Sequence, residues 1–194
     1  MNKKKFDYVV IGAGIAGCSL AYFLSKYSKS ILLIDRNSQV AFGASGAAGA
    51  FLSPLLGKPN DFKDLVTKSL IFSTNFYKNL GEELVSNCGV CRIPKNEEDR
   101  DKFESYKPYM DFKYTQMDDG YFFEIGSQVT PSLICEKLTK DIEKKLSYNV
   151  IKLEQNENST WIINDEICAK NIILTTGADV KHIKEDYFDI RGVW

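Results

Sequence analysis

The sequence predicts an α/β protein: a Rossmann-like domain with a βαβ unit, a parallel sheet and a small antiparallel meander, accompanied by part of an α+β domain. Two observations indicate this fold. Apolar, β-branched runs at residues 5–11 and 30–35 flank a glycine-rich turn and a helical segment at residues 18–28. A third buried strand is expected at residues 171–175, and parallel strands require crossover connections rather than tight turns.

The elements between these strands follow from apolar periodicity and from stop signals such as Gly81. In chain order, the expected elements are a helix at 61–80, a strand at 90–93, a charged, solvated helix within 95–107, a strand at 121–125, a helix at 131–146, and the meander strands at 149–154, 160–164 and 166–169. We expect residues 1–80 and 126–180 to form the first, discontinuous domain. Residues 81–125 and 181–194 are expected to form part of the second.

The composition is that of an ordinary globular protein. Of the 194 residues, 44% are hydrophobic and 26% are charged, which excludes disordered, collagen-like and coiled-coil proteins. The net charge of −1 argues against a dedicated nucleic-acid-binding protein, so no DNA partner is expected. The sequence has no apolar run of the length that a membrane-spanning helix needs, so no membrane association is expected.

Two features bear on the cellular compartment. The five cysteines are an odd set that does not suggest a disulfide framework, and reduced cytoplasmic thiols are the simpler interpretation. The basic residues 3–5, the apolar stretch after them and Cys18 also resemble a lipoprotein-type signal peptide. Asp7 stands at the head of that apolar stretch, and a second pattern explains the same residues better.

That second pattern is the segment Gly12-Ala13-Gly14-Ile15-Ala16-Gly17, which follows the first strand and opens the first helix. In G-x-G-x-x-G, the first glycine permits a tight turn, the second lets the backbone approach a pyrophosphate, and the third lets helix and strand pack closely. The helix N-terminus offers N–H groups to phosphate oxygens. Asp35, at the end of the second strand, is placed to accept hydrogen bonds from ribose hydroxyls and disfavours the 2′-phosphate of NADP.

The segment after Asp35 bears on which dinucleotide binds, because FAD and NAD share the part that the turn recognises. Residues 44–50 are all small, and residues 40–57 contain no Lys, Glu or Asp. Such a run suits a backbone lying along an extended cofactor, with Ser45 able to hydrogen-bond phosphate or ribitol. A flexible linker is the alternative, but the lack of charge suggests burial.

In the stretches DYVVIGAGIAGCSLAYFLS, ILLIDR, GASGAAGAFLSPLLGK and NIILTTGAD, the chain resembles the FAD-dependent oxidoreductases of the D-amino-acid oxidase and glycine oxidase superfamily. Within that superfamily, ASGAAGAFLSPLLGKPND and CGVCRIP are most similar to the oxidase half of the bifunctional enzymes that modify the tRNA wobble uridine. That half removes a carboxymethyl group from 5-carboxymethylaminomethyluridine.

The resemblance implies that FAD is the cofactor. It would be held by the glycine turn, the end of the second strand and the small-residue run, with a backbone contact to adenine and a closing contact near the third strand. The implied residues are Gly12, Gly14, Ile15, Ala16, Gly17, Asp35, Arg36, Ala44, Ser45, Gly49, Val150, Thr176 and Gly177.

The resemblance also implies oxidation of an amine C–N bond, with hydride transfer to the flavin and hydrolysis of the resulting imine. The expected partner is a small-molecule amine of the N-carboxymethyl or amino-acid type, or modified tRNA. Such oxidases often lack an essential protein base, so no catalytic residue is assigned, and no metal is expected. Lys58 and Arg92 are candidates for holding a substrate carboxylate, although such residues are more often ordinary surface charges.

Relatives of this kind are roughly twice as long, as expected of two-domain enzymes. The segment 189–194 resembles the start of the second half of their substrate sheet, so that sheet would have open edges here. Three interpretations stay open: an amine oxidoreductase of the tRNA-modifying type, a glycine- or sarcosine-type oxidase, and a non-catalytic FAD-binding fragment that needs a complementing C-terminal half or partner subunit. An NAD-dependent dehydrogenase lacks an acid–base constellation in this sequence.

Cys88 and Cys91 form a C-x-x-C pair. Zinc would require a second pair or a histidine partner, and the one histidine, His182, is expected at the surface of a charged segment. No helix follows the pair as in thioredoxin-like motifs. We therefore expect both cysteines to be structural thiols, in the manner of small buried residues.

Overall fold

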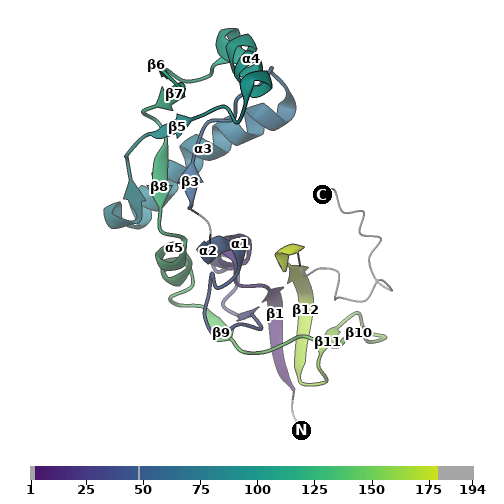
Figure 1. Ribbon diagram of the computed structural model, residues 1–194. Helices are drawn as coiled ribbons and strands as arrows, with labels where there is room; N and C mark the ends of the chain where they lie inside the picture. Colours follow the sequence, from purple (N-terminus) through teal and green to yellow (C-terminus); the bar gives the residue numbers. More distant parts are fainter. Residues whose placement is uncertain (1–2, 48, 179–194) are drawn as a thin grey trace. The chain divides into compact units, whose positions relative to one another are not determined.

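The structure is a computed structural model that describes residues 3–47 and 49–178 (Figure 1). The chain divides into two compact units, one formed by the described residues of Met1–Ala48 and Pro131–Trp194, the other by Gly49–Thr130. Residues 49–80 and 126–130, assigned above to the first domain, therefore group with the second unit. These units are defined by contacts within the chain, so the division into functional domains given above stays a prediction.

The first unit is built on a six-stranded sheet with the strand order β10-β11-β12-β1-β2-β9 (Figure 1). Strand β1 pairs in parallel with β2 and β12, and β2 pairs in parallel with β9. The antiparallel strands β10 and β11 continue the sheet beyond β12. Their bounds are β1 (Lys4–Ile11), β2 (Ile31–Ile34), β9 (Glu143–Lys145), β10 (Leu153–Gln155), β11 (Trp161–Ile163) and β12 (Ile167–Leu174). The predicted α/β fold with a parallel sheet and a small meander is confirmed.

The core of this unit lies on both faces of the parallel strands. Val9, Val10 and Leu33 are completely buried, as expected for central strands covered on both sides. Helix α1 (Ile15–Leu24) packs against β1 and β2 and against α5 (Pro131–Leu138), which also contacts the short helix α2 (Ala44–Ala47). The crossover from β1 through α1 to β2 is the βαβ unit that the sequence predicts.

Several predicted bounds were wrong. Helix α1 begins at Ile15 inside the glycine turn rather than at residue 18, because the turn itself supplies its first helical residues. The helix expected at 131–146 ends at Leu138, where Thr139 Oγ1 donates to the Cys135 carbonyl, and residues 143–145 instead form β9. The strands expected at 166–169 and 171–175 are one strand, β12, which is antiparallel to β11 in its first part and parallel to β1 along its length.

The second unit contains two small antiparallel sheets and two main helices. The sheet orders are β3-β8-β4 and β5-β7-β6, and only β5 and β7 correspond to predicted strands. Phe103, Tyr121 and Phe123 form its buried aromatic cluster. The bounds are β3 (Phe51–Leu52), α3 (Asp61–Leu80), η1 (Glu82–Leu84), β4 (Val85–Ser86), β5 (Val90–Arg92), α4 (Glu97–Tyr106), η2 (Lys107–Tyr109), β6 (Thr115–Met117), β7 (Gly120–Phe123) and β8 (Ser127–Val129).

A buried lysine fastens the first turn of α3. The Asn60 side chain caps this helix by accepting the Lys63 N–H at 3.0 Å. The Lys63 ammonium, almost fully buried, donates to the Tyr109 carbonyl and pairs with the Asp111 carboxylate at 3.1 Å. These contacts hold the end of η2 and the segment after it against the helix, and they explain why a lysine can be buried here.

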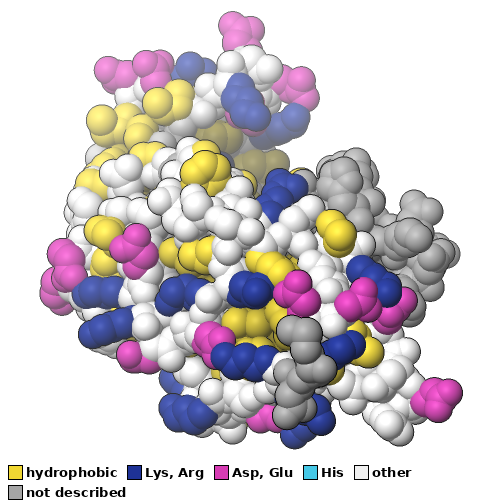
Figure 2. All heavy atoms as spheres, turned by 90° about the horizontal axis from the view of Figure 1, so that it is seen from below, with side chains coloured by type: hydrophobic (Ala, Val, Ile, Leu, Met, Phe, Trp, Pro, Cys, Tyr) yellow, Lys and Arg dark blue, Asp and Glu magenta, His cyan; other side chains and the backbone are white. Residues whose placement is uncertain are grey.

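Charges on the surface are mixed. On the face of the molecule in Figure 2, basic and acidic side chains are interspersed rather than gathered by sign. Two examples in the first unit are the pairs Lys4–Glu143 and Lys170–Asp7. The Lys170 ammonium and the Ser28 hydroxyl hold the pKa of Asp7 below its usual value. Within the described residues, no helix is both long and apolar enough to cross a membrane.

Candidate dinucleotide-binding site

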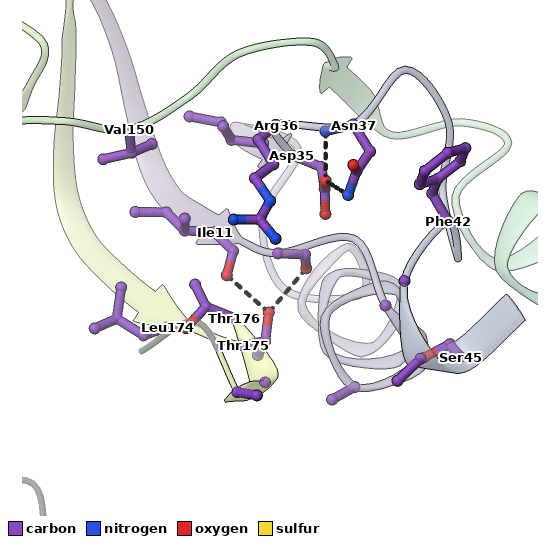
Figure 3. Close-up of a pocket in the computed structure, with 18 of the residues that line it drawn as sticks. Ile11, Asp35, Arg36, Asn37, Phe42, Ser45, Val150, Leu174, Thr175 and Thr176 are labelled. Atoms are coloured by element: carbon purple, nitrogen blue, oxygen red, sulfur yellow. Dashed lines mark hydrogen bonds between the residues drawn. The ribbon is translucent and has the colours of Figure 1, made fainter. Parts of the chain in front are cut away.

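A cavity of about 650 Å³ lies in the first unit, at the carboxyl ends of β1, β2 and β12 (Figure 3). Open α/β sheets bind their ligands at this edge, where the loops that leave the strands converge. The walls of the cavity are the glycine turn, the end of β2, the loop before α2, residues 148–150 and the end of β12. Five segments that are far apart in the sequence therefore meet at one pocket.

The glycine turn is held by contacts that leave no room for side chains. Gly12 has a φ of +109°, and a Cβ there would lie 2.4 Å from the Thr175 carbonyl oxygen. A Cβ at Gly17 would lie 1.9 Å from the Gly12 carbonyl oxygen. Thr175 Oγ1 donates toward the carbonyls of Ile11 and Gly12 at 3.0 and 2.9 Å, which ties the turn to the end of β12. Both glycines thus have the packing roles that the motif predicts.

The N-terminus of α1 opens into the pocket. Gly14 is the N-cap residue and has no side chain to cap the helix. The Ile15 N–H donates to Ser45 Oγ at 3.0 Å, so the Ser45 hydroxyl proton remains available to a phosphate oxygen. A Cβ at Gly14 would meet one atom within 4 Å, this same Ser45 Oγ at 3.1 Å. The position of Gly14 is therefore open on the pocket side, as close approach of a pyrophosphate requires.

Asp35 joins the glycine turn to the end of β2. Its Oδ2 accepts the Ala13 N–H at 2.6 Å, and its Oδ1 accepts the backbone and side-chain N–H groups of Asn37 at 2.8 and 2.9 Å. These bonds fix the carboxylate at the rim of the pocket. Each carboxylate oxygen can accept more than one hydrogen bond, so Asp35 retains capacity for ribose hydroxyls. In Figure 3 the Arg36 side chain extends into the same space.

The end of β12 adds one further polar atom. Thr176 Oγ1 is buried and has no hydrogen-bond partner within the described residues. Such buried hydroxyls are normally paired, so an unpaired one in a pocket wall indicates a ligand or a water. Together with the helix N-terminus, Ser45 and Asp35, it makes a donor and acceptor set that suits an adenosine diphosphate.

The structure brings most of the predicted site residues to this pocket. Gly17 lies behind the turn, where it packs, and Gly49 belongs to the second unit. That the residues contact a cofactor stays a prediction. The predicted residues that line the pocket are Gly12, Gly14, Ile15, Ala16, Asp35, Arg36, Ala44, Ser45, Val150, Thr176 and Gly177.

Sequence reasoning missed several lining residues, among them Asn37, Phe42, Tyr148, Asn149 and Thr175. The Asn37 contact could have been found, because an Asp two residues before an Asn favours a local turn. The residues at 148–149 carry no such signal, since only the return of the chain beside β2 brings them here. Burial raises the pKa of the Tyr148 phenol, which donates to Glu166 at 3.2 Å.

The two candidates for a substrate carboxylate lie in the second unit. Lys58 is exposed. Arg92 is half-buried, and its Nη1 donates to Ser53 Oγ at 3.3 Å and to the Pro54 carbonyl at 3.5 Å. Neither of these partners carries a negative charge to balance the guanidinium. Of the two candidates, Arg92 is therefore the better placed to bind an anion. His182 lies outside the described residues.

The cysteines do not follow the expectation in full. Cys88 and Cys91 are exposed, so the interpretation of this pair as small buried residues was wrong. All five thiols are free. Cys18 is buried, its Sγ donates to the Ala13 carbonyl at 3.3 Å, and a hydrogen bond with Cys135 together with burial raises its pKa. Within the described residues, no group of three metal-ligating side chains occurs.

Comparisons with known proteins agree with this geometry. The model of the FAD dependent oxidoreductase family (DAO) matches residues 7–192. The chain is 24% identical over 160 residues to the tRNA 5-methylaminomethyl-2-thiouridine biosynthesis bifunctional protein MnmC of Campylobacter fetus subsp. fetus, covering 80% of the chain and 26% of that protein. It is 25% identical over 211 residues to the D-amino acid dehydrogenase of Helicobacter pylori, covering 97% and 51%.

Among solved structures, glycine oxidase from Geobacillus kaustophilus superimposes with a TM-score of 0.76 at 13% sequence identity. The match covers 90% of this chain and 56% of that one. The chain thus spans between a quarter and about half of the relatives it resembles.

Proposed function

The chain belongs to the FAD-dependent oxidoreductase (DAO) family, and from this premise we propose that it forms the FAD-binding portion of an enzyme that oxidises a C–N bond of an amine. The observation that carries the proposal is the pocket in which the open Gly14 position, Ser45 and Asp35 meet at the N-terminus of α1. We further propose that the substrate carries an N-carboxymethyl group and is a modified wobble uridine of tRNA. The resemblance to MnmC supports this substrate.

The roles of the chain's residues follow from the site. The N–H groups at the start of α1 and the Ser45 hydroxyl would hold the pyrophosphate, and the helix dipole favours its negative charge. Asp35 would accept hydrogen bonds from the ribose, and the backbone near Val150 would contact adenine. Bound FAD supplies a two-electron acceptor for the hydride that leaves the carbon next to nitrogen, after which water hydrolyses the imine.

The first experiment is the absorption spectrum of the purified 194-residue chain, recorded before and after desalting. A flavin band that survives desalting would support the proposed cofactor site. Retention should fall in Asp35→Ala, while Asp61→Ala, which changes an exposed acid at the start of α3, serves as the matched control. A colourless, folded chain that takes up no added FAD would contradict the proposal.

The second experiment distinguishes the substrates. The FAD-loaded protein is mixed without oxygen with tRNA bearing 5-carboxymethylaminomethyluridine, with glycine or with sarcosine, and bleaching of the flavin band is followed. We expect bleaching by the modified tRNA. Bleaching by the free amino acids alone would favour the second candidate, an amino-acid oxidoreductase, which the resemblance to D-amino acid dehydrogenase supports. A loaded protein that no substrate bleaches would favour the third candidate, a non-catalytic FAD-binding chain.

We also propose a cytoplasmic location. The five free thiols support it, because free cysteines are typical of reducing compartments. A fractionation experiment with an antibody against the chain tests this, and recovery in an oxidising compartment would contradict it.

A further inference from the structure

Phe42 is an exposed aromatic residue on the wall of the pocket. Its side chain is 58% exposed, and it lines the cavity together with Gly43, Ala44 and Ser45. Single exposed apolar side chains are common on protein surfaces, so exposure alone gives Phe42 no role. What distinguishes Phe42 is the backbone that carries it.

The residue before it, Ala41, has a left-handed backbone with a φ of 55° and is almost fully buried. Residues with side chains adopt this conformation at a cost, and such strain gathers at ligand-binding sites. The Ala41 N–H donates to the Ala13 carbonyl of the glycine turn at 2.8 Å. On its other side, a Cβ at Gly46 would lie 2.1 Å from the Ala41 carbonyl oxygen, so α2 packs directly against it.

Ala41 is therefore fixed between the glycine turn and α2, and Phe42 leaves this anchored point toward the pocket. In Figure 3 the Phe42 ring lies on the same side of the pocket as Ser45, across from Val150. Ser45 is the residue that accepts the Ile15 N–H at the helix N-terminus. Phe42 thus stands beside the part of the pocket that suits the ribose and the diphosphate, and away from the part that suits adenine.

We propose that Phe42 is an apolar cover for the ribose–diphosphate part of the cofactor. This inference rests on the proposed FAD site and adds to it a residue outside the glycine motif and the small-residue run. An apolar ring over the diphosphate excludes water from the contacts between phosphate oxygens and the N–H groups of α1. Electrostatic interactions that are shielded from water are stronger and less sensitive to salt.

The test measures binding of ADP and of FAD by calorimetry, which requires no catalytic activity. In Phe42→Ala the affinities for ADP and FAD should both fall by roughly five- to fifty-fold, the range for losing part of the burial of a large apolar side chain. This loss of affinity should grow as the salt concentration is raised. Without the ring, the diphosphate is exposed to water and to the ions that screen its charge. Phe42→Leu, which keeps an apolar side chain of similar reach, should restore most of the affinity and the weak salt dependence.

Tyr27→Ala is the matched control, since Tyr27 is an aromatic residue of the same unit that is 85% exposed and does not line the pocket. Its affinities should equal those of the unchanged chain. Equal ADP affinity in Phe42→Ala and the unchanged chain would overturn the inference while leaving the FAD site intact. An affinity loss in Phe42→Leu as large as in Phe42→Ala would also overturn it, because ring stacking would then be the contact. If the unchanged chain bound neither ADP nor FAD, the proposed function itself would fail, and the inference with it.

Discussion

Alanine at Gly17 should lower the stability of the chain, whereas alanine at Gly14 should leave the stability nearly unchanged and weaken cofactor binding. At Gly17 the new Cβ would lie 1.9 Å from the Gly12 carbonyl oxygen and 2.6 Å from Thr175 Oγ1. The nearer atom belongs to the backbone of the turn, so α1 and the end of β1 must move apart. Overpacking of this kind costs about 1–3 kcal/mol. For a chain of this size, that corresponds to a thermal midpoint lower by about 2–12 °C.

At Gly14 the same substitution meets one close atom, which need shift by only a few tenths of an ångström because it ends a serine side chain. The backbone there has φ −75° and ψ −177°, which any residue adopts, and the nearest atom is the Ser45 hydroxyl oxygen at 3.1 Å. Replacing glycine by alanine at a compatible site stabilises a protein by about 0.4–1 kcal/mol through the unfolded state. The midpoint should therefore stay constant or rise slightly. The methyl group would occupy the space that a pyrophosphate needs, so FAD affinity should fall at least about tenfold, or 1.4 kcal/mol.

The assay pairs thermal unfolding, followed by circular dichroism, with equilibrium dialysis of FAD. Each variant serves as the control for the other, because both add one methyl group to the same motif. Loss of stability in Gly14→Ala as large as in Gly17→Ala would refute the assignment of separate roles. Full FAD affinity in Gly14→Ala would refute the assignment of this position to the pyrophosphate.

Three further predictions follow from the contacts of single residues. Ser45→Ala should weaken FAD binding by about 10- to 100-fold, which is the range for one hydrogen bond to a charged group. Equilibrium dialysis measures this loss, and unchanged binding would show that Ser45 does not contact the cofactor. A thiol reagent should modify Cys88 and Cys91 rapidly in the native chain, and the three buried cysteines only after unfolding. A different number of rapidly modified cysteines would contradict the burial described above. In urea unfolding, Lys63→Met should lower the stability by about 1–3 kcal/mol, because a carbonyl and a carboxylate lose their buried partner, while the exposed Lys68→Met should change it little.

Much of the first unit could be predicted because its signals are local. The two apolar strands and the glycine turn between them are adjacent in sequence, and Asp35 marks the end of the second strand. Patterns of this length need no information from distant residues. The strands at 90–92 and 120–123 were found for the same reason, although their bounds shifted by one or two residues.

The errors arose where pairing with a distant partner decided the structure. Residues 143–145, Glu-Lys-Lys, have no strand propensity of their own, yet they pair in parallel with β2. The short strands β3, β4, β6 and β8 likewise acquire their conformation from their neighbours in a sheet. The expectation that the C-x-x-C pair is buried was wrong, because residue type alone does not determine whether Cys88, in a loop, and Cys91, on an edge strand, meet solvent.

The sequence by itself determined the βαβ unit, the glycine turn and the acid at the end of β2, and the resemblance of four longer stretches indicated the family and FAD. Only the tertiary structure decided which other segments complete the pocket. It is the parallel pairing of β1 with β12 that sets Thr175 against the turn, and the path of the chain beside β2 that brings residues 148–150 to the same rim. The left-handed backbone of Ala41, which directs Phe42 to the pocket wall, likewise depends on the glycine turn and α2, which hold that backbone from both sides. Contacts between residues so far apart in the chain form only when the whole sheet has assembled.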